Sequence, residues 1–227
     1  MKTLTLLIAL SAPLVLRAPL AAQRSPAELP QLAQELFVAE TVYPQERGEV
    51  QLTAFTPVSD AGHPRLLGEY GITGRLQLSL VSPAIGSDAE DEENSWEAGV
   101  LYALLPHASP VAVSLEMEVS LAADQAAHWE PVLIAARGFG PVQLHGSVRT
   151  ELDDPGDEVT GALAALVDAG KWTPTLEAVW DAAGGDLLVP GLFVHPTEQA
   201  EAGIGVPVCL ACNEHPHGVR LMATVEF

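Results

Sequence analysis

The stretch Gly218-Val219-Arg220-Leu221-Met222-Ala223-Thr224-Val225-Glu226-Phe227 alternates apolar residues with mostly polar ones. Successive side chains of a β-strand point to opposite sides, so a period of two predicts one apolar face and one polar face. A strand of this kind fits a membrane β-barrel and a soluble β-sandwich equally. The rest of the chain has to separate these two folds.

The same alternation recurs along the chain after residue 47, most cleanly between Val111 and Ala122. Val111, Val113 and Leu115 begin an apolar face there, and the intervening positions are small or acidic. We expect twelve strands, with ten as the fallback, at residues 48–57, 65–71, 74–81, 96–105, 111–122, 130–138, 142–149, 159–170, 175–181, 186–195, 200–208 and 218–227.

Short and long connections alternate between these strands. The short set comprises residues 72–73, 106–109, 139–140, 171–173 and 196–197, and the longer, more acidic set comprises 58–64, 82–95, 123–129, 152–158, 182–185 and 209–217. Outer-membrane barrels have this asymmetry and an even strand count, whereas a Greek-key sandwich has no reason for it. The sequence therefore predicts an all-β, antiparallel, up-and-down transmembrane β-barrel.

Composition agrees with this prediction. The chain is 48% hydrophobic at a net charge of −20, and its mean hydropathy is +0.22. A lipid-facing barrel combines high hydropathy with the absence of long apolar runs, because every second residue of each strand is apolar. The excess of 30 acidic over 10 basic residues argues against nucleic-acid binding and against docking on anionic lipid headgroups.

The N-terminal region divides into two segments ahead of the barrel at 48–227. Residues 1–22 have the basic start, apolar run and small residues of a cleaved secretory signal peptide. In residues 23–47, Ser25-Pro26-Ala27-Glu28 forms a capping box, and the apolar spacing that follows predicts a short periplasmic helix to about Val38. This helix could plug the barrel, pack at its rim or be a mobile leader.

Several segments resemble a family of bacterial outer-membrane transporters named for a protein of the phenol meta-cleavage pathway. These are Tyr43-Pro44-Gln45-Glu46-Arg47-Gly48-Glu49-Val50, Tyr70–Leu78, Pro190–Phe193 and Gly203–Pro207, within a similarity that covers Phe37–Phe227. The loop that contains the cysteines departs from the short acidic loop of that family.

This resemblance implies uptake or efflux of small, often apolar or aromatic, molecules through the outer membrane. It implies outer-membrane lipid and the barrel assembly machinery as partners, the latter reading Phe227 as a terminal assembly signal. It brings no catalytic residues and no cofactor. The alternative function is a closed structural barrel whose acidic outer loops bind a partner.

The polar residues opposite the apolar face would line the lumen. They form either a polar, mildly cation-preferring path or a packed lumen that rigidifies the barrel. The charged and titratable members are Glu49, Arg75, Glu97, Glu116, Glu118, Arg137, His145, Arg149, Glu177, Asp181, Glu201, Arg220 and Glu226.

Three other constellations have competing interpretations. Cys209 and Cys212 favour a disulfide in an exported protein, and a metal site with His215 and His217 is the weaker alternative. The acidic run at 88–93 is read as a solvated loop rather than a Ca²⁺ site. His145 and Ser147 have the spacing of an outer-membrane hydrolase pair, but their neighbours turn them inward, so an enzyme is the least favoured hypothesis.

Overall fold

The computed structural model describes residues 29–56, 63–86, 95–105, 110–121, 127–152, 159–181, 185–212 and 218–227. The expected signal peptide, the acidic run at 88–93 and the two histidines at 215 and 217 lie outside these residues. Within the described part, no helix is long and apolar enough to cross a membrane.

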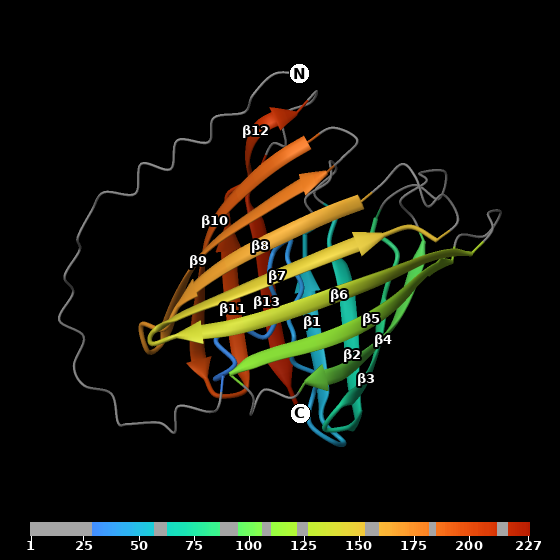
Figure 1. Ribbon diagram of the computed structural model, residues 1–227, viewed down its shortest axis with the longest axis horizontal. Helices are drawn as coiled ribbons and strands as arrows, with labels where there is room; N and C mark the ends of the chain where they lie inside the picture. The colour runs from blue at the N-terminus through green and yellow to red at the C-terminus, as the bar shows by residue number, and fades with distance from the viewer. Residues whose placement is uncertain are drawn as a thin grey trace.

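All described strands belong to one antiparallel sheet that curls into a closed barrel (Figure 1). Each strand pairs with its neighbour in sequence up to β10, and β13 closes the ring by pairing with β1 and β11. The strands are β1 (Val50–Phe55), β2 (Arg65–Thr73), β3 (Leu76–Val81), β4 (Trp96–Leu105), β5 (Val111–Leu121), β6 (His128–Phe139), β7 (Val142–Thr150), β8 (Val159–Val167), β9 (Trp172–Asp181), β10 (Gly185–Thr197), β11 (Ala200–Gly205), β12 (Val208–Cys212) and β13 (Arg220–Glu226).

β11 and β12 are two parts of one barrel strand. Both pair with β10, and Val206–Pro207 separates them. Proline lacks the N–H that a sheet ladder needs, so an interruption at this position is expected. The barrel therefore has twelve strands, which confirms the predicted fold class and strand number.

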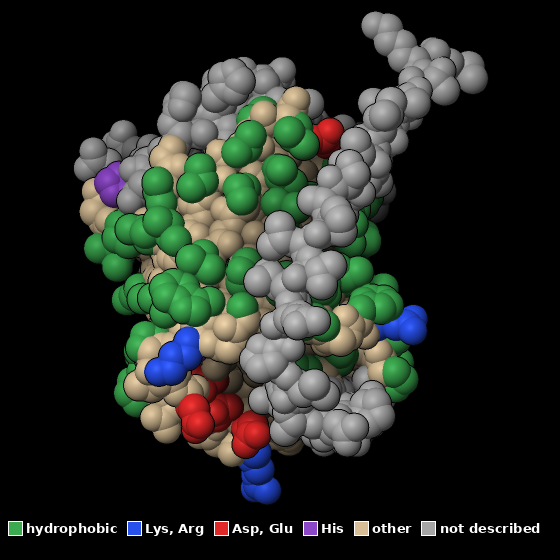
Figure 2. Space-filling model, turned by 90° about the vertical axis from the view of Figure 1, so that its left-hand side faces the viewer, with side chains coloured by type: hydrophobic (Ala, Val, Ile, Leu, Met, Phe, Trp, Pro, Cys, Tyr) green, Lys and Arg blue, Asp and Glu red, His purple; other side chains and the backbone are tan. Residues whose placement is uncertain are grey.

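The outer face of the barrel is apolar. Large side chains such as Leu52, Leu133 and Leu163 are about half exposed there, and hydrophobic side chains cover much of the face in Figure 2, with most charged groups at its lower end. The inward positions carry mostly polar side chains, small side chains or buried apolar side chains. Period-two alternation thus gives the strands the two faces that the sequence predicts.

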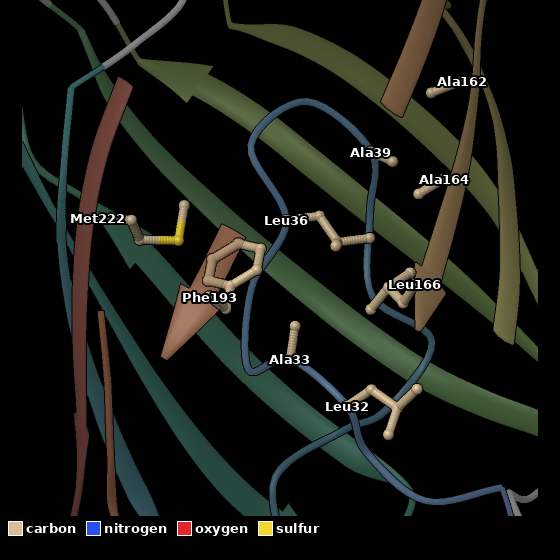
Figure 3. Close-up of a cluster of buried hydrophobic side chains, with 9 residues drawn as sticks. All are labelled: Leu32, Ala33, Leu36, Ala39, Ala162, Ala164, Leu166, Phe193 and Met222. Atoms are coloured by element: carbon tan, nitrogen blue, oxygen red, sulfur yellow. The ribbon is translucent and has the colours of Figure 1, made fainter. Parts of the chain in front are cut away.

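Residues 29–47, here called the plug segment, fold inside the barrel. The first residues of the segment, 29–34, lie beside Gly138 and the β8–β9 turn. Glu40, farther along the segment, contacts Arg149 of the wall. The segment then returns to the start of β1, where Gly48 N–H donates to Gly71 O at 2.7 Å. Figure 3 shows this loop with Leu32, Leu36 and other side chains packed against the wall. The wall residues of the cluster are Ala162, Ala164, Leu166, Phe193 and Met222.

The predicted N-terminal helix is absent from its described part, residues 29–38, which is irregular. Its first residues, 23–28, lie outside the described chain. The apolar positions that suggested a helix, such as Leu29, Leu32 and Leu36, are buried inside the barrel instead. Carboxylates of the wall accept hydrogen bonds from the backbone N–H groups of Gln34 and Phe37–Ala39.

Candidate functional site in the barrel lumen

The side chain of Glu177 in β9 binds the main chain at the middle of the plug segment. Its carboxylate accepts hydrogen bonds from the backbone N–H groups of Phe37 at 3.1 Å, Val38 at 2.8 Å and Ala39 at 3.0 Å. The residue has no exposed surface. A buried carboxylate needs such donors, and charge-assisted hydrogen bonds are the stronger kind.

Other wall residues bind the plug segment on both sides of this point. The Glu201 carboxylate of β11 accepts from Gln34 N–H at 3.2 Å, and Gln77 Oε1 of β3 accepts from Gln45 N–H at 2.7 Å. The wall also donates to main-chain carbonyl groups. Ser114 Oγ donates to Val42 O at 2.7 Å, and Gln143 Nε2 donates to Pro30 O at 2.9 Å.

Aromatic rings of the plug segment contact the wall as well. The ring of Phe37 stacks on Phe193 of β10, with centroids 4.7 Å apart and planes 15° apart. Tyr43 meets His145 of β7 edge-on, with centroids 5.7 Å apart. Burial raises the pKa of the Tyr43 phenol, which therefore stays neutral.

A network of carboxyl and amide groups joins the plug segment to β1, β2 and β3. Gln51 Nε2 donates to Glu35 Oε1 at 3.0 Å and also to Glu69, and Gln77 Nε2 donates to Glu69. Burial, followed by the nearby charge of Glu69, raises the pKa of the Glu35 carboxyl well above its ordinary value.

A cavity of about 570 Å³ lies between the plug segment and the ends of the strands that lead to the longer connections. Its wall is strongly acidic, and two arginines offset part of the charge. Arg65 is 2.7 Å from Glu97, and Arg149 is 2.7 Å from Glu40, 3.1 Å from Glu118 and 3.2 Å from Glu130. The glutamates that line the cavity are Glu35, Glu40, Glu69, Glu97, Glu116, Glu118, Glu130 and Glu151.

Most of the predicted lumen residues do face the interior. Glu97, Glu116, Glu118 and Arg149 line the cavity. Glu49 and Glu226 lie at the end of the barrel with the short turns, and the side chain of Asp181 lies outside the described part. His145, Glu177, Glu201 and Arg220 are buried inside.

Two predicted lumen residues lie elsewhere. Arg137 is exposed on the outer face, with its guanidinium carbon 5.0 Å from the ring centroid of Phe139. Its strand, β6, buries Val132, Ile134 and Ala136 inside, so alternation sends Arg137 outward. Arg75 is exposed in the β2–β3 turn, beyond the strand ends.

The lumen residues predicted from the sequence do not include several uncharged residues that hold the plug segment. Gln51, Gln77, Gln143 and Ser114 are all buried and inward-facing. They alternate with the apolar positions just as the charged residues do, so the same pattern would have included them. Glu69 is also buried inside, and the short strand assigned to it had no clear alternation.

Two further groups of side chains could form a disulfide or hold a metal ion. Cys209 is disulfide-bonded, while the side chain of Cys212 lies outside the described residues. Among the described residues, His128, Glu130 and Glu151 have ligand atoms within 4.8 Å of one another and could hold a metal ion. His128 Nε2 is 3.1 Å from Glu151 Oε1 and 3.7 Å from Glu130 Oε1, so contacts among the three side chains already account for this cluster.

His145 and Ser147 both face the lumen and are buried. The Nε2 atom of His145 is 2.8 Å from Gln143 Oε1, and its ring packs on Tyr43. Neither residue is presented to the apolar outer face, where a lipid-acting pair would need to lie.

The fold is shared with solved porin structures. The chain superposes on the KdgM porin with a TM-score of 0.57 at 11% identity, covering 79% of this chain and 98% of that one. The KdgM porin in complex with disordered oligogalacturonate gives a TM-score of 0.56 at the same identity and coverage. At 11% identity this likeness establishes the fold alone.

No protein-family model and no curated protein matches the sequence. The resemblance to the phenol meta-cleavage pathway family is therefore not confirmed.

Proposed function

We propose that this protein is an outer-membrane β-barrel channel for small molecules, closed by its plug segment and selective for cations. The observation that carries this proposal is the combination of an apolar outer face with a polar, acid-lined interior. The fold that the chain shares with porins supports the same function.

The outer face supports a position in lipid. Leu133, Trp172 and Leu221 are all about half exposed in the barrel, as are side chains on every side of it. Burying an exposed leucine in an apolar phase contributes roughly 1.5 to 3 kcal/mol. In water such a continuous apolar surface would favour aggregation, so a bilayer is the environment that suits it. Outer-membrane lipid and the barrel assembly machinery are the partners that follow.

The interior supports a gated path rather than a permanently open one. The plug segment fills the lumen below the cavity, and it is held there by hydrogen bonds, an ion pair and the packing of apolar side chains such as Leu36 on the wall rather than by a β-ladder. Polar contacts of this kind can be exchanged for water when the segment leaves. An opening therefore requires no change in the strands of the barrel.

The charge of the cavity supports cation preference. Apart from Glu35, its lining has seven glutamates and two arginines, and rings of acidic side chains favour cations in pores. The second KdgM structure contains oligogalacturonate, a carboxylate-bearing sugar chain, which an acid-lined cavity would repel. We therefore propose a solute class different from that one. Apolar or aromatic solutes remain a prediction from the sequence resemblance.

The reversal potential across a planar bilayer under a salt gradient tests this function. We expect the open protein to prefer cations and the Glu116→Gln/Glu118→Gln double variant to lose most of that preference. The control is Glu46→Gln, since Glu46 is exposed and does not line the cavity. Anion preference in the native protein, or an unchanged potential in the double variant, would contradict the assignment.

The filled lumen favours one other function, a closed barrel whose outer loops bind a partner. In that case the plug segment would be a permanent part of the core. The same bilayer experiment distinguishes the two, because a folded closed barrel would give no current steps under any voltage.

A lipid hydrolase using His145 and Ser147 is disfavoured by the inward position of both residues. Lipid hydrolysis that disappears in the Ser147→Ala variant would reverse this conclusion.

A further inference from the structure

We propose that the lumen recognises a short basic peptide that bends at one aromatic residue, through that aromatic side chain and the adjacent main-chain N–H groups. In the closed protein, Phe37 and its neighbours in the plug segment occupy this binding site in place of such a peptide. The inference rests on the proposed channel function, because such a peptide would reach the site from the lumen when the plug segment leaves.

The aromatic part of the site is a slot formed by Gly191 of β10 together with Gly203 and Gly205 of β11. A Cβ atom at Gly191 would lie 2.5 Å from Cε2 of Phe37, and one at Gly205 would lie 3.0 Å from Cδ2. A Cβ at Gly203 would lie 3.0 Å from Cζ of the same ring. Glycine in a strand often marks such a close approach, and here three of them surround one ring.

Phe193 completes the slot. Its ring stacks on that of Phe37 at 4.7 Å and has no exposed surface. An offset stack of this kind contributes about 0.5 to 1.5 kcal/mol beyond the buried area. The slot therefore selects a flat aromatic ring over an aliphatic side chain.

The main-chain part of the site is the Glu177 carboxylate. It accepts the N–H of the residue whose ring fills the slot and the N–H groups of the next two residues. None of these hydrogen bonds depends on a side chain of the bound segment. Residues 37–39 bend, so that their three successive N–H groups converge on one carboxylate. A peptide with an aromatic residue followed by two ordinary residues can supply the same donors when it adopts this bend.

Main-chain contacts continue away from the slot. Gln143 donates to Pro30 O, and Ser114 donates to Val42 O. In such a site the main-chain hydrogen bonds provide affinity, and the side-chain pocket provides specificity.

The cavity determines the charge of the preferred peptide. Glu116, Glu118 and Glu130 line it next to the plug segment. An acid-lined opening concentrates positively charged ligands. The ligand class is thus a basic peptide with an aromatic residue.

The test measures how fast a glutamate-specific protease cuts the full-length protein after Glu35 and Glu40. Both residues lie in the plug segment, so cleavage reports its displacement. The probe is a peptide of lysine and alanine with one central phenylalanine, which contains no cleavage site. We expect it to accelerate cleavage about tenfold at saturation, because a ligand that binds only the open state shifts the population towards it.

Three control ligands test the named contacts. The first is the same peptide methylated on the phenylalanine nitrogen and the next two nitrogens, the second has alanine in place of phenylalanine, and the third is spermidine. We expect none of them to accelerate cleavage. Equal acceleration by the methylated peptide, by the alanine peptide or by spermidine would overturn the proposal, and so would no acceleration by the probe.

Failure of this inference can be told apart from failure of the channel function. Current steps in a bilayer without any effect of the peptide would retain the channel and remove the peptide site. A peptide effect without current steps would retain the binding site and remove the channel.

Discussion

Arg149 connects the plug segment to three strands of the wall. Its guanidinium group is 2.7 Å from Glu40, 3.1 Å from Glu118 and 3.2 Å from Glu130. Without it, these carboxylates would repel one another around the cavity. We expect Arg149→Met to lower the free energy of unfolding by about 2 to 3 kcal/mol and to expose Glu40 to a glutamate-specific protease. Urea titration in detergent and the rate of cleavage measure the two effects.

Arg137→Met is the matched control, because Arg137 lies outside the lumen and contacts the ring of Phe139. We expect the loss of such a contact at an exposed site to cost about 0.5 to 1 kcal/mol and to leave protease cleavage unchanged. Equal protease sensitivity in the two variants would contradict the role assigned to Arg149.

Glu35 makes the stability of the plug segment depend on pH. Burial and the charge of Glu69 raise the pKa of Glu35 in the folded protein, so folding favours its protonated form. The stability that this provides is complete below the ordinary pKa of a glutamate and is lost as pH rises through the raised pKa.

We therefore expect Glu35→Gln to be more stable than the native protein at neutral pH, since the amide can keep the contact with Gln51 without a charge. The difference should shrink under acid conditions. Urea titrations of both proteins at acid and neutral pH measure this trend. A difference that grows towards acid pH would have the wrong sign.

The strands are the elements that the sequence predicts best. In β13 and β7 apolar residues alternate with mostly polar ones, and the structure turns the mostly polar set inside. Prediction fails in β6, where apolar residues such as Ile134 and Leu133 occupy both faces. Without polar positions to mark the inner face, the side of Arg137 cannot be read from its own strand.

The lipid-facing side of a strand gives a direct test of the barrel in a bilayer. Leu133 lies at the middle of β6 and is 51% exposed. We expect Leu133→Arg to destabilise the barrel in lipid vesicles by about 2 to 4 kcal/mol, whereas Leu121→Arg at the end of β5 should cost only about 0 to 1 kcal/mol. Urea unfolding in vesicles measures both values. Equal costs would mean that the apolar band does not cross a membrane.

The plug segment is the element that the sequence could not predict. Its apolar residues recur at helical spacing, and that pattern describes an amphipathic helix in isolation. What decides its conformation is the set of acceptors on distant strands, chiefly Glu177 and Glu201. These residues lie more than a hundred positions away along the chain, so no local pattern contains the information.

The whole molecule combines a lipid-compatible exterior with a lumen in two parts. The part nearer the longer connections is an acid-lined cavity, and the part nearer the short turns is filled by the plug segment. The polar residues that could conduct ions are therefore in place, but a segment of the same chain covers them. The sequence predicts the residues that line the lumen but does not decide whether the lumen is open. In the structure the plug segment occupies it.

Single-channel recording in a planar bilayer tests the central claim, that the barrel is a channel closed by the plug segment. Phe37→Ala removes the ring that fills the glycine slot, and Phe139→Ala removes an exposed ring from the outer face. We expect rare, brief current steps from the native protein and from Phe139→Ala, and the same steps with much longer open times from Phe37→Ala. Silence in all three proteins, each folded as a barrel, would contradict the claim and indicate a permanently closed structure.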